Sequence, residues 1–145
     1  MTIILGCTVF AIAGALVLGT PLSAATQPSP AAVQTLPKAG QKITLGSSNY
    51  FIFGFSQTPK IGMAVMKVAI FTQDGRKDTS FTIKGDVDMP SMRGMHSSGD
   101  KVFAVSAKGD YLLPVHLAMP GGWEFKFNFE KAGTTVLTGI HLFDL

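Results

Sequence analysis

The fold of this chain is decided by residues 123–130, which read Trp123-Glu124-Phe125-Lys126-Phe127-Asn128-Phe129-Glu130. Four aromatic side chains alternate with four polar ones, and a period of two places the two kinds on opposite faces of a β-strand. No window of similar length in the chain repeats apolar residues at helical spacing. The stretch therefore predicts a strand with one buried face and one solvated face.

Similar short runs, separated by Gly, Pro, Asp and Ser, occur on both sides of this strand. Asp74-Gly75 is typical of a tight hairpin turn between two of them. Seven to eight strands at such regular spacing predict an all-β fold, an immunoglobulin-like antiparallel β-sandwich. Gly109-Asp110-Tyr111 resembles the tyrosine corner of such domains, whereas the lack of paired cysteines excludes an antibody-type domain. The expected strands are residues 42–45, 50–55, 62–71, 79–87, 101–107, 111–117, 122–129 and 134–143.

The beginning of the chain differs from the rest in composition. Residues 2–18 are uncharged and mostly apolar, and the small residues Ser23-Ala24-Ala25 follow. This layout predicts an N-terminal hydrophobic helix over residues 1–25, which is either a cleaved signal peptide or a retained membrane anchor. Residues 26–40 contain three prolines and are expected to form a linker. Residues 41–145 would then form one exported domain, periplasmic or otherwise outside the cytoplasm.

Charge and cysteine content exclude several classes of function. The formal net charge is +3, and the basic residues are scattered rather than interleaved with aromatic ones, so nucleic-acid binding is not expected. Cys7 is the single cysteine and lies in the predicted leader, so neither a disulfide nor a cysteine-based zinc site is expected in the domain. The signature motifs of hydrolases, phosphate-binding loops and zinc proteases are also missing, and we expect no enzymatic activity.

Soft metal-binding side chains gather at two places in the chain. A thioether is polarisable and imidazole is a borderline ligand, so a mixture of the two suits copper better than magnesium or calcium. Alternation of strand direction is expected to bring residues 89–99, 118–121 and 57–61 to one end of the sandwich. The candidate copper ligands are Met89, Met92, Met95, His96, His116 and Met119.

Each of these residues also has a purely structural interpretation. Methionine is a common filler of irregular gaps in a core, and a lone histidine such as His116 is often a structural group. Trp123 is expected to anchor the core, with a lid over a metal loop as the alternative. Asp86 and Asp88 are expected on a solvated strand face, and His141 is expected to point to solvent or to a partner.

The motifs between Gly85 and Phe127 resemble the YtkA-like domain family. The resemblance rests on Asp88-Met89-Pro90, the Met/His loop that follows, Gly109-Asp110-Tyr111 and Met119-Pro120-Gly121-Gly122-Trp123-Glu124. It implies a small exported or membrane-anchored β-sandwich, met among copper-handling and respiratory-oxidase proteins, and more distantly a similarity to FixH-type accessory proteins. The residues that match the family pattern are Met89, His96, Met119 and Trp123.

One departure from that pattern bears on the choice of ion. Met92 stands where relatives often have a further histidine, which favours Cu(I) over Cu(II). The first hypothesis is therefore an exported binding domain that holds or delivers copper at one end. The second is a metal-free interaction module whose apolar end docks on a membrane protein, for example a copper-handling or respiratory-oxidase protein.

Overall fold

The protein is represented by a computed structural model that describes residues 32–145. The predicted leader or anchor, residues 1–25, and the first part of the predicted linker lie outside the described residues. Within residues 32–145, no helix is long and apolar enough to cross a membrane. The elements are β1 (Val33–Thr35), β2 (Ile43–Leu45), β3 (Asn49–Phe55), β4 (Gly62–Thr72), β5 (Phe81–Asp88), the 3-10 helix η1 (Pro90–Met92), β6 (Lys101–Val102), β7 (Ala104–Val105), β8 (Tyr111–Leu117), β9 (Gly122–Lys131) and β10 (Thr134–Asp144).

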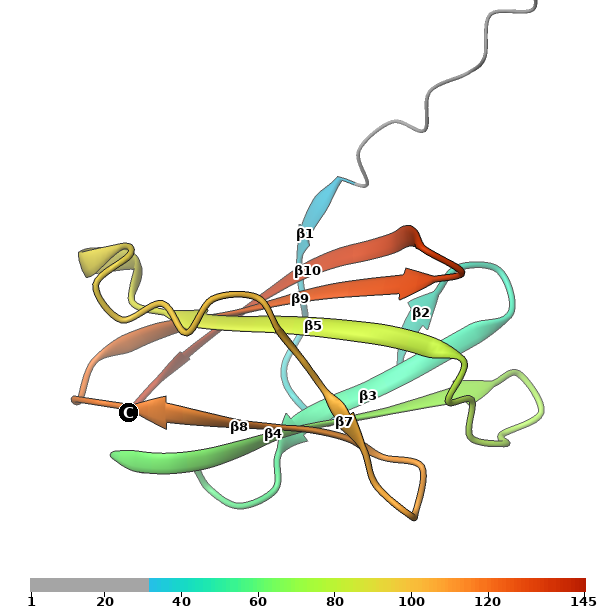
Figure 1. Cartoon of the computed structure of the whole chain (residues 1–145), viewed down its shortest axis with the longest axis horizontal. Helices are drawn as coiled ribbons and strands as arrows, with labels where there is room; N and C mark the ends of the chain where they lie inside the picture. Colours follow the sequence, from blue (N-terminus) through green and yellow to red (C-terminus); the bar gives the residue numbers. More distant parts are fainter. Residues whose placement is uncertain (1–31) are drawn as a thin grey trace, which may run out of the picture.

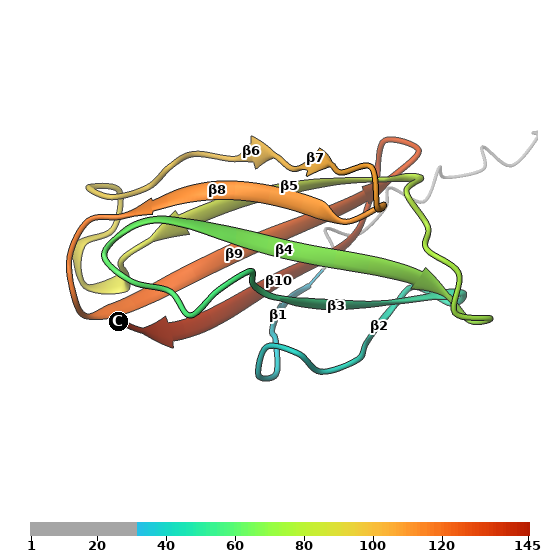
Figure 2. The ribbon, with the colours of Figure 1, turned by 90° about the horizontal axis from the view of Figure 1, so that it is seen from below.

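The strands form two five-stranded sheets packed face to face, so the predicted sandwich is confirmed. Sheet A has the order β1-β10-β9-β5-β6 and sheet B the order β2-β3-β4-β8-β7. Every pair is antiparallel except β1 with β10, which is parallel. Figure 1 shows β10, β9 and β5 in one layer above β4 and β8, and Figure 2 shows β4 crossing in front of β9.

The core is built by the alternation that the sequence of β9 predicts. Its four aromatic side chains are all buried, whereas the polar residues between them face outward. The ring centroids of Phe129 and Phe51 lie 4.5 Å apart, and those of Phe127 and Phe53 lie 5.2 Å apart, so these pairs join sheet A to sheet B. Burial of each such side chain contributes about 1.5–3 kcal/mol. These aromatic rings provide the main cohesion between the sheets.

The expected single strand at residues 101–107 is split in the structure. Its first part, β6, pairs with β5 in sheet A, and its second part, β7, pairs with β8 in sheet B. Phe103 lies between the two parts and is buried, where it occupies the space left by Gly85. A Cβ on Gly85 would lie 2.7 Å from the Phe103 ring. The chain changes sheets here because this aromatic side chain enters the core between two exposed residues.

The predicted linker also differs from the structure at its C-terminal part. Residues Val33–Thr35, which were assigned to the linker, form β1 and pair with β10. Leu36 follows and is only 5% exposed, packed directly over Gly139. The prolines on either side predict an extended chain that buries little, but the pairing of β1 with β10 and the burial of Leu36 attach this segment to sheet A.

Tyr111 joins the two sheets through its hydroxyl group. The side chain is buried, and its Oη donates a hydrogen bond of 2.9 Å to the backbone oxygen of Phe81 at the start of β5. In a tyrosine corner, the tyrosine hydroxyl bonds to the backbone only a few residues upstream. Phe81 lies 30 residues before Tyr111, so the predicted resemblance is wrong in this detail. The bond here bridges sheet B to sheet A instead.

Candidate functional site

Three connections meet at one end of the sandwich, which we call the pole. Gly62 is paired with Leu117, Asp88 with Glu124, and Gly122 with Asp144. The segments 56–61, 89–100 and 118–121 therefore lie at the same end, on the left in Figure 1. The predicted convergence of these connections is confirmed, because the antiparallel order of the strands requires it.

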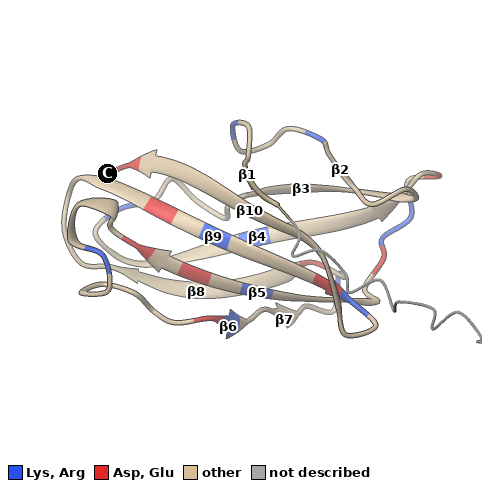
Figure 3. Ribbon diagram, turned by 90° about the horizontal axis from the view of Figure 1, so that it is seen from above, with Lys and Arg blue, Asp and Glu red and all other residues tan. Residues whose placement is uncertain are grey.

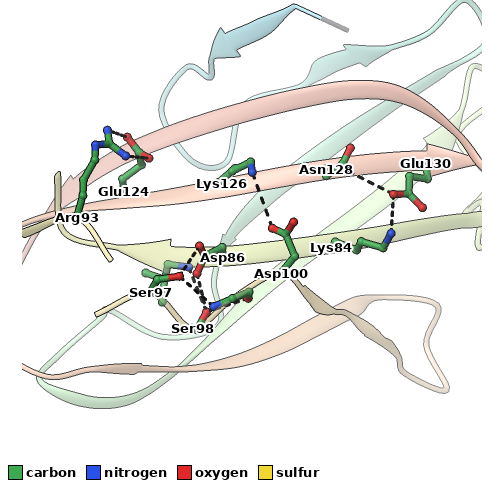
Figure 4. A network of polar contacts seen from close by, with 12 residues as sticks. Lys84, Asp86, Arg93, Ser97, Ser98, Asp100, Glu124, Lys126, Asn128 and Glu130 are labelled. Atoms are coloured by element: carbon green, nitrogen blue, oxygen red, sulfur yellow. Dashed lines mark hydrogen bonds and ion pairs between the residues drawn. The ribbon is translucent and has the colours of Figure 1, made fainter. Parts of the chain in front are cut away.

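The segment after β5 is fastened to that strand by two carboxylates. Asp88 accepts hydrogen bonds of 2.8 Å from the backbone N–H groups of Gly94 and Met89. Asp86 accepts hydrogen bonds from the hydroxyl groups of Ser97 and Ser98, at 2.8 and 3.1 Å (Figure 4). The hydrogen bond from the Gly94 N–H lowers the pKa of Asp88 below its ordinary value of 3.8. Both residues lie on the outward face of β5, as predicted, and both also hold the loop, which the sequence did not indicate.

A second attachment joins the tip of this loop to β9. Both terminal nitrogens of Arg93 bond to the Glu124 carboxylate, at 3.1 and 3.2 Å. This two-bond geometry is the most specific form of an arginine–carboxylate pair, and Figure 4 shows it at the end of β9. Arg93 therefore positions the loop, and its charge is already matched by Glu124.

Trp123 connects this loop to the segment between β8 and β9. The side chain is 1% exposed, which confirms that it anchors the core. Its Nε1–H donates a hydrogen bond of 3.1 Å to the backbone oxygen of Met119, and its ring centroid lies 5.9 Å from that of His96. A single buried side chain is thus hydrogen-bonded to Met119 and lies beside the ring of His96.

The predicted ligands differ in their access to solvent. Met89 is 3% exposed, and its methyl group packs against the backbone at Gly121, so it is a core residue. Met92 and Met119 are half-buried and pack on the core from outside. Met95 is 76% exposed, and His96 is half-buried beside Trp123. Met89 therefore has the structural role that the alternative interpretation predicts. The side chains of the other candidates remain accessible to a ligand, namely Met92, Met95, His96 and Met119.

His116 lies at the pole but apart from this group. It is on β8, where Val115 and Leu117 point into the core and His116 points outward from sheet B. The residue directly opposite it on β4 is Met63, which is also exposed. The pattern of β8 indicates this outward direction, but only the register of β4 against β8 identifies the neighbour.

His141 does not point to solvent, and that prediction is wrong. Its ring lies 4.9 Å from the Phe53 ring, edge to face, and 5.9 Å from the Phe143 ring. Burial lowers the pKa of His141. It faces the core because its register partner Phe125 does so, whereas the neighbouring apolar residue Leu142 is exposed.

The charges of the two sheets differ where they face outward. β5 and β9 carry acidic and basic residues that form ion pairs, for example Lys84 with Glu130 at 2.8 Å. Figure 3 shows acidic and basic residues on both β5 and β9 of sheet A, whereas β4 carries one lysine and no acidic residue. Within residues 32–145 there is no group of three or more His, Cys, Asp or Glu that could hold a metal ion. The side chains at the pole that remain as candidate donors are thioethers and imidazole, which soft and borderline ions prefer.

The fold and the pole together define a class: an immunoglobulin-like β-sandwich domain that displays thioether and imidazole groups at one end. Residues 51–128, which are more than half of the chain, match the YtkA-like family, so the chain belongs to that family. The match extends from β3 into β9 and includes the loop held by Asp88 and Trp123. The similarity to FixH-type proteins stays a prediction. A search of curated proteins and a search of solved structures each found no match.

Proposed function

We propose that the domain binds Cu(I) reversibly at the pole. The observation that carries this proposal is the joint attachment of two donor-bearing segments to Trp123: the Met119 carbonyl on its indole N–H, and the His96 ring 5.9 Å from its own. Met92 and Met95 lie in the same fastened loop. The proposed ligands are therefore Met92, Met95, His96 and Met119, and Met89 is removed from the predicted set because it fills the core.

The chemistry of these groups favours the monovalent ion. Thioethers select Cu(I) over harder ions, and imidazole accepts either oxidation state of copper. The nearby carboxylates of Asp86, Asp88 and Glu124 are already engaged by hydroxyl, amide and guanidinium groups. These three carboxylates therefore hold the loop, and the neutral thioether and imidazole donors beside them fit an ion of low charge.

The exposure of the donors suits an ion that is passed on. Met95 is 76% exposed, so its thioether can leave one ion and reach another without a change in the core. Met92 and Met119 pack on the core and would hold the ion in place. Copper, when bound, would be exchangeable, and the chain would contribute orientation of the donors and partial exclusion of water.

We also propose that this takes place outside the cytoplasm. The support is the uncharged apolar run of residues 2–18 followed by small residues at 23–25, which is the layout of an export signal or anchor. A thiol-free domain that relies on thioethers suits an oxidising compartment, where a cysteine-based site would be lost.

Competition for Cu(I) tests the proposal. The full chain is titrated anaerobically with Cu(I) in the presence of a chelator, and compared with a triple variant carrying Met92→Leu, Met95→Leu and His96→Asn. These changes remove the donors and nearly preserve volume, so the affinity is expected to fall by about tenfold or more, the scale seen when a metal site is disturbed. The matched control is Met89→Leu, which should leave the affinity unchanged. Equal affinities of the wild type and the triple variant would contradict the proposal.

A second candidate function is favoured by a specific observation. Four of the large apolar residues exposed in the described part of the chain lie at the pole: Ile61, Met63, Met95 and Leu142. Several exposed apolar groups at the same end of a domain favour an interaction there. The domain would then dock on a membrane protein that handles copper or belongs to a respiratory oxidase, with no metal required. Replacement of Ile61 and Leu142 by Ser should abolish docking in this case and leave Cu(I) affinity unchanged.

A further inference from the structure

The outer face of sheet B carries a methionine and a histidine side by side. β4 and β8 run antiparallel, with Met63 directly opposite His116. Both side chains point away from the core, because Ala64 on β4 packs against the core and Val115 and Leu117 on β8 are buried. Directly opposed residues of such a pair have Cβ atoms about 4.5–5.5 Å apart. A thioether sulfur and an imidazole nitrogen can therefore approach the same ion.

Neither side chain has a structural role that accounts for its position. Met63 is 69% exposed, so it contributes little to the core. Among the described residues, no hydrogen bond to the His116 ring is found, and the ring is exposed. An exposed methionine alone does not indicate a binding site. Here, however, the strand register places the thioether of Met63 next to the imidazole of His116.

The surroundings decide which ion the pair could take. The three central strands of sheet B, β3, β4 and β8, contain no Asp or Glu. The charged residue on β4 is Lys67, in the middle of the strand, and it is paired with Asp110 at 3.4 Å. A divalent ion that requires carboxylate ligands finds none on these three strands, whereas a soft monovalent ion requires only neutral donors.

The pair also has open space beside it. Met63 borders a hollow of about 280 Å³ that is lined by Ser56, Gln57, Thr58 and Lys60 of the β3–β4 connection. A pair of donors on a flat sheet leaves the remaining sides of an ion uncovered. Such a site fits transient binding, because a further ligand from another molecule can enter without displacing either residue.

We propose that Met63 and His116 form a second, shallow Cu(I) site on the outer face of sheet B, separate from the loop donors around Trp123. This second site rests on the proposed function only for the choice of Cu(I) as its ion. Its two residues are inferred from the register of β4 with β8. His116 is thereby assigned to this pair and not to the loop, and Met63 becomes a ligand. The two sites are formed by different elements, the loop after β5 and the β4–β8 pair.

Methionine methyl resonances separate the two sites. The full chain is labelled with ¹³C at the methionine methyl groups and titrated with Ag(I), a diamagnetic substitute for Cu(I). We expect the Met63 methyl signal to shift with the ion. Met66 lies on the same strand and is completely buried, so its signal is the internal control and should not move. In the variant His116→Gln, the apparent affinity reported by Met63 should fall at least tenfold, while Met92 and Met95 keep their response.

The outcomes distinguish this proposal from the proposed function. A Met63 signal that stays in place while Met92 and Met95 shift would overturn the second site and leave the loop site intact. A Met63 binding curve that is the same in wild type and His116→Gln would also overturn it. A shift of Met63 alone, lost in His116→Gln, would support the second site even though the loop site had failed.

Discussion

Gly85 in β5 is a residue at which packing leaves no room for a side chain. A Cβ there would lie 2.7 Å from the Phe103 ring and 2.9 Å from the side chains of Leu113 and Phe125. Three side chains from both sheets converge on the space that this glycine leaves free. Because interiors are packed as densely as organic crystals, even one methyl group must displace them.

We therefore predict that Gly85→Ala lowers the free energy of unfolding by about 1–3 kcal/mol, the usual cost of overpacking a core. Urea denaturation followed by tryptophan fluorescence would measure it, since Trp123 is in the same core. Gly54→Ala is the matched control, because a Cβ on Gly54 makes only an ordinary contact of 3.7 Å with Ala39. Equal losses in the two variants would show that the Gly85 contact is unimportant.

Asp88 provides a pH-dependent prediction at the same scale. Hydrogen bonds from Gly94 and then Met89 hold the pKa of Asp88 below 3.8. Its contribution to stability is therefore present above that ordinary value and is lost as the pH falls through the lowered pKa. In Asp88→Asn this titration is removed. The difference in stability between wild type and variant should be constant at neutral pH and shrink below about pH 3.8, as measured by urea denaturation at several pH values. A difference that grows on acidification would contradict the assignment.

Strands in which apolar and polar residues alternate clearly could be predicted from the sequence. Segments whose path depends on the burial of one side chain could not. The alternation in β9 and the turns between strands predict nearly all strand positions and the convergence of connections at the pole. The sequence does not predict the crossing at Phe103 or the burial of Leu36, because in each case one buried apolar residue decides the path of a segment whose neighbouring residues are exposed. The role of Asp86 was missed because its serine partners lie on a loop with no period. The candidate site was predictable as a group of residue types, but its division into two sets depends on the register of β4 with β8.

The short strand β1 tests whether the segment before residue 41 belongs to the domain. Leu36 is 5% exposed and covers Gly139, so Leu36→Ala should lower the free energy of unfolding by about 2–4 kcal/mol, as for other buried leucines. Val33 is in the same segment but 60% exposed, and Val33→Ala should change stability by less than about 0.5 kcal/mol. Thermal unfolding of both variants is the measurement, and a loss no greater for Leu36→Ala than for Val33→Ala would restore the linker interpretation.

At the level of the whole molecule, the two sheets and the pole have separate tasks. Sheet A presents ion-paired strands to water, and the pairs on it are too exposed to add much stability. Their arrangement instead holds the loop at the pole, through Arg93 with Glu124 and Ser97 with Asp86. Sheet B presents a face with little charge that ends at Met63 and His116. The pole is where the core, the fastened loop and the exposed apolar residues meet.

X-ray absorption at the copper edge of the Cu(I)-loaded full chain tests the central claim most directly. The account predicts a first coordination shell of sulfur and imidazole nitrogen atoms. In the variant with Met92→Leu, Met95→Leu and His96→Asn, the sulfur contribution should fall sharply, whereas Met89→Leu should leave the spectrum unchanged. A coordination shell with no sulfur in the wild type, or one that the triple variant retains in full, would contradict a copper site at the pole.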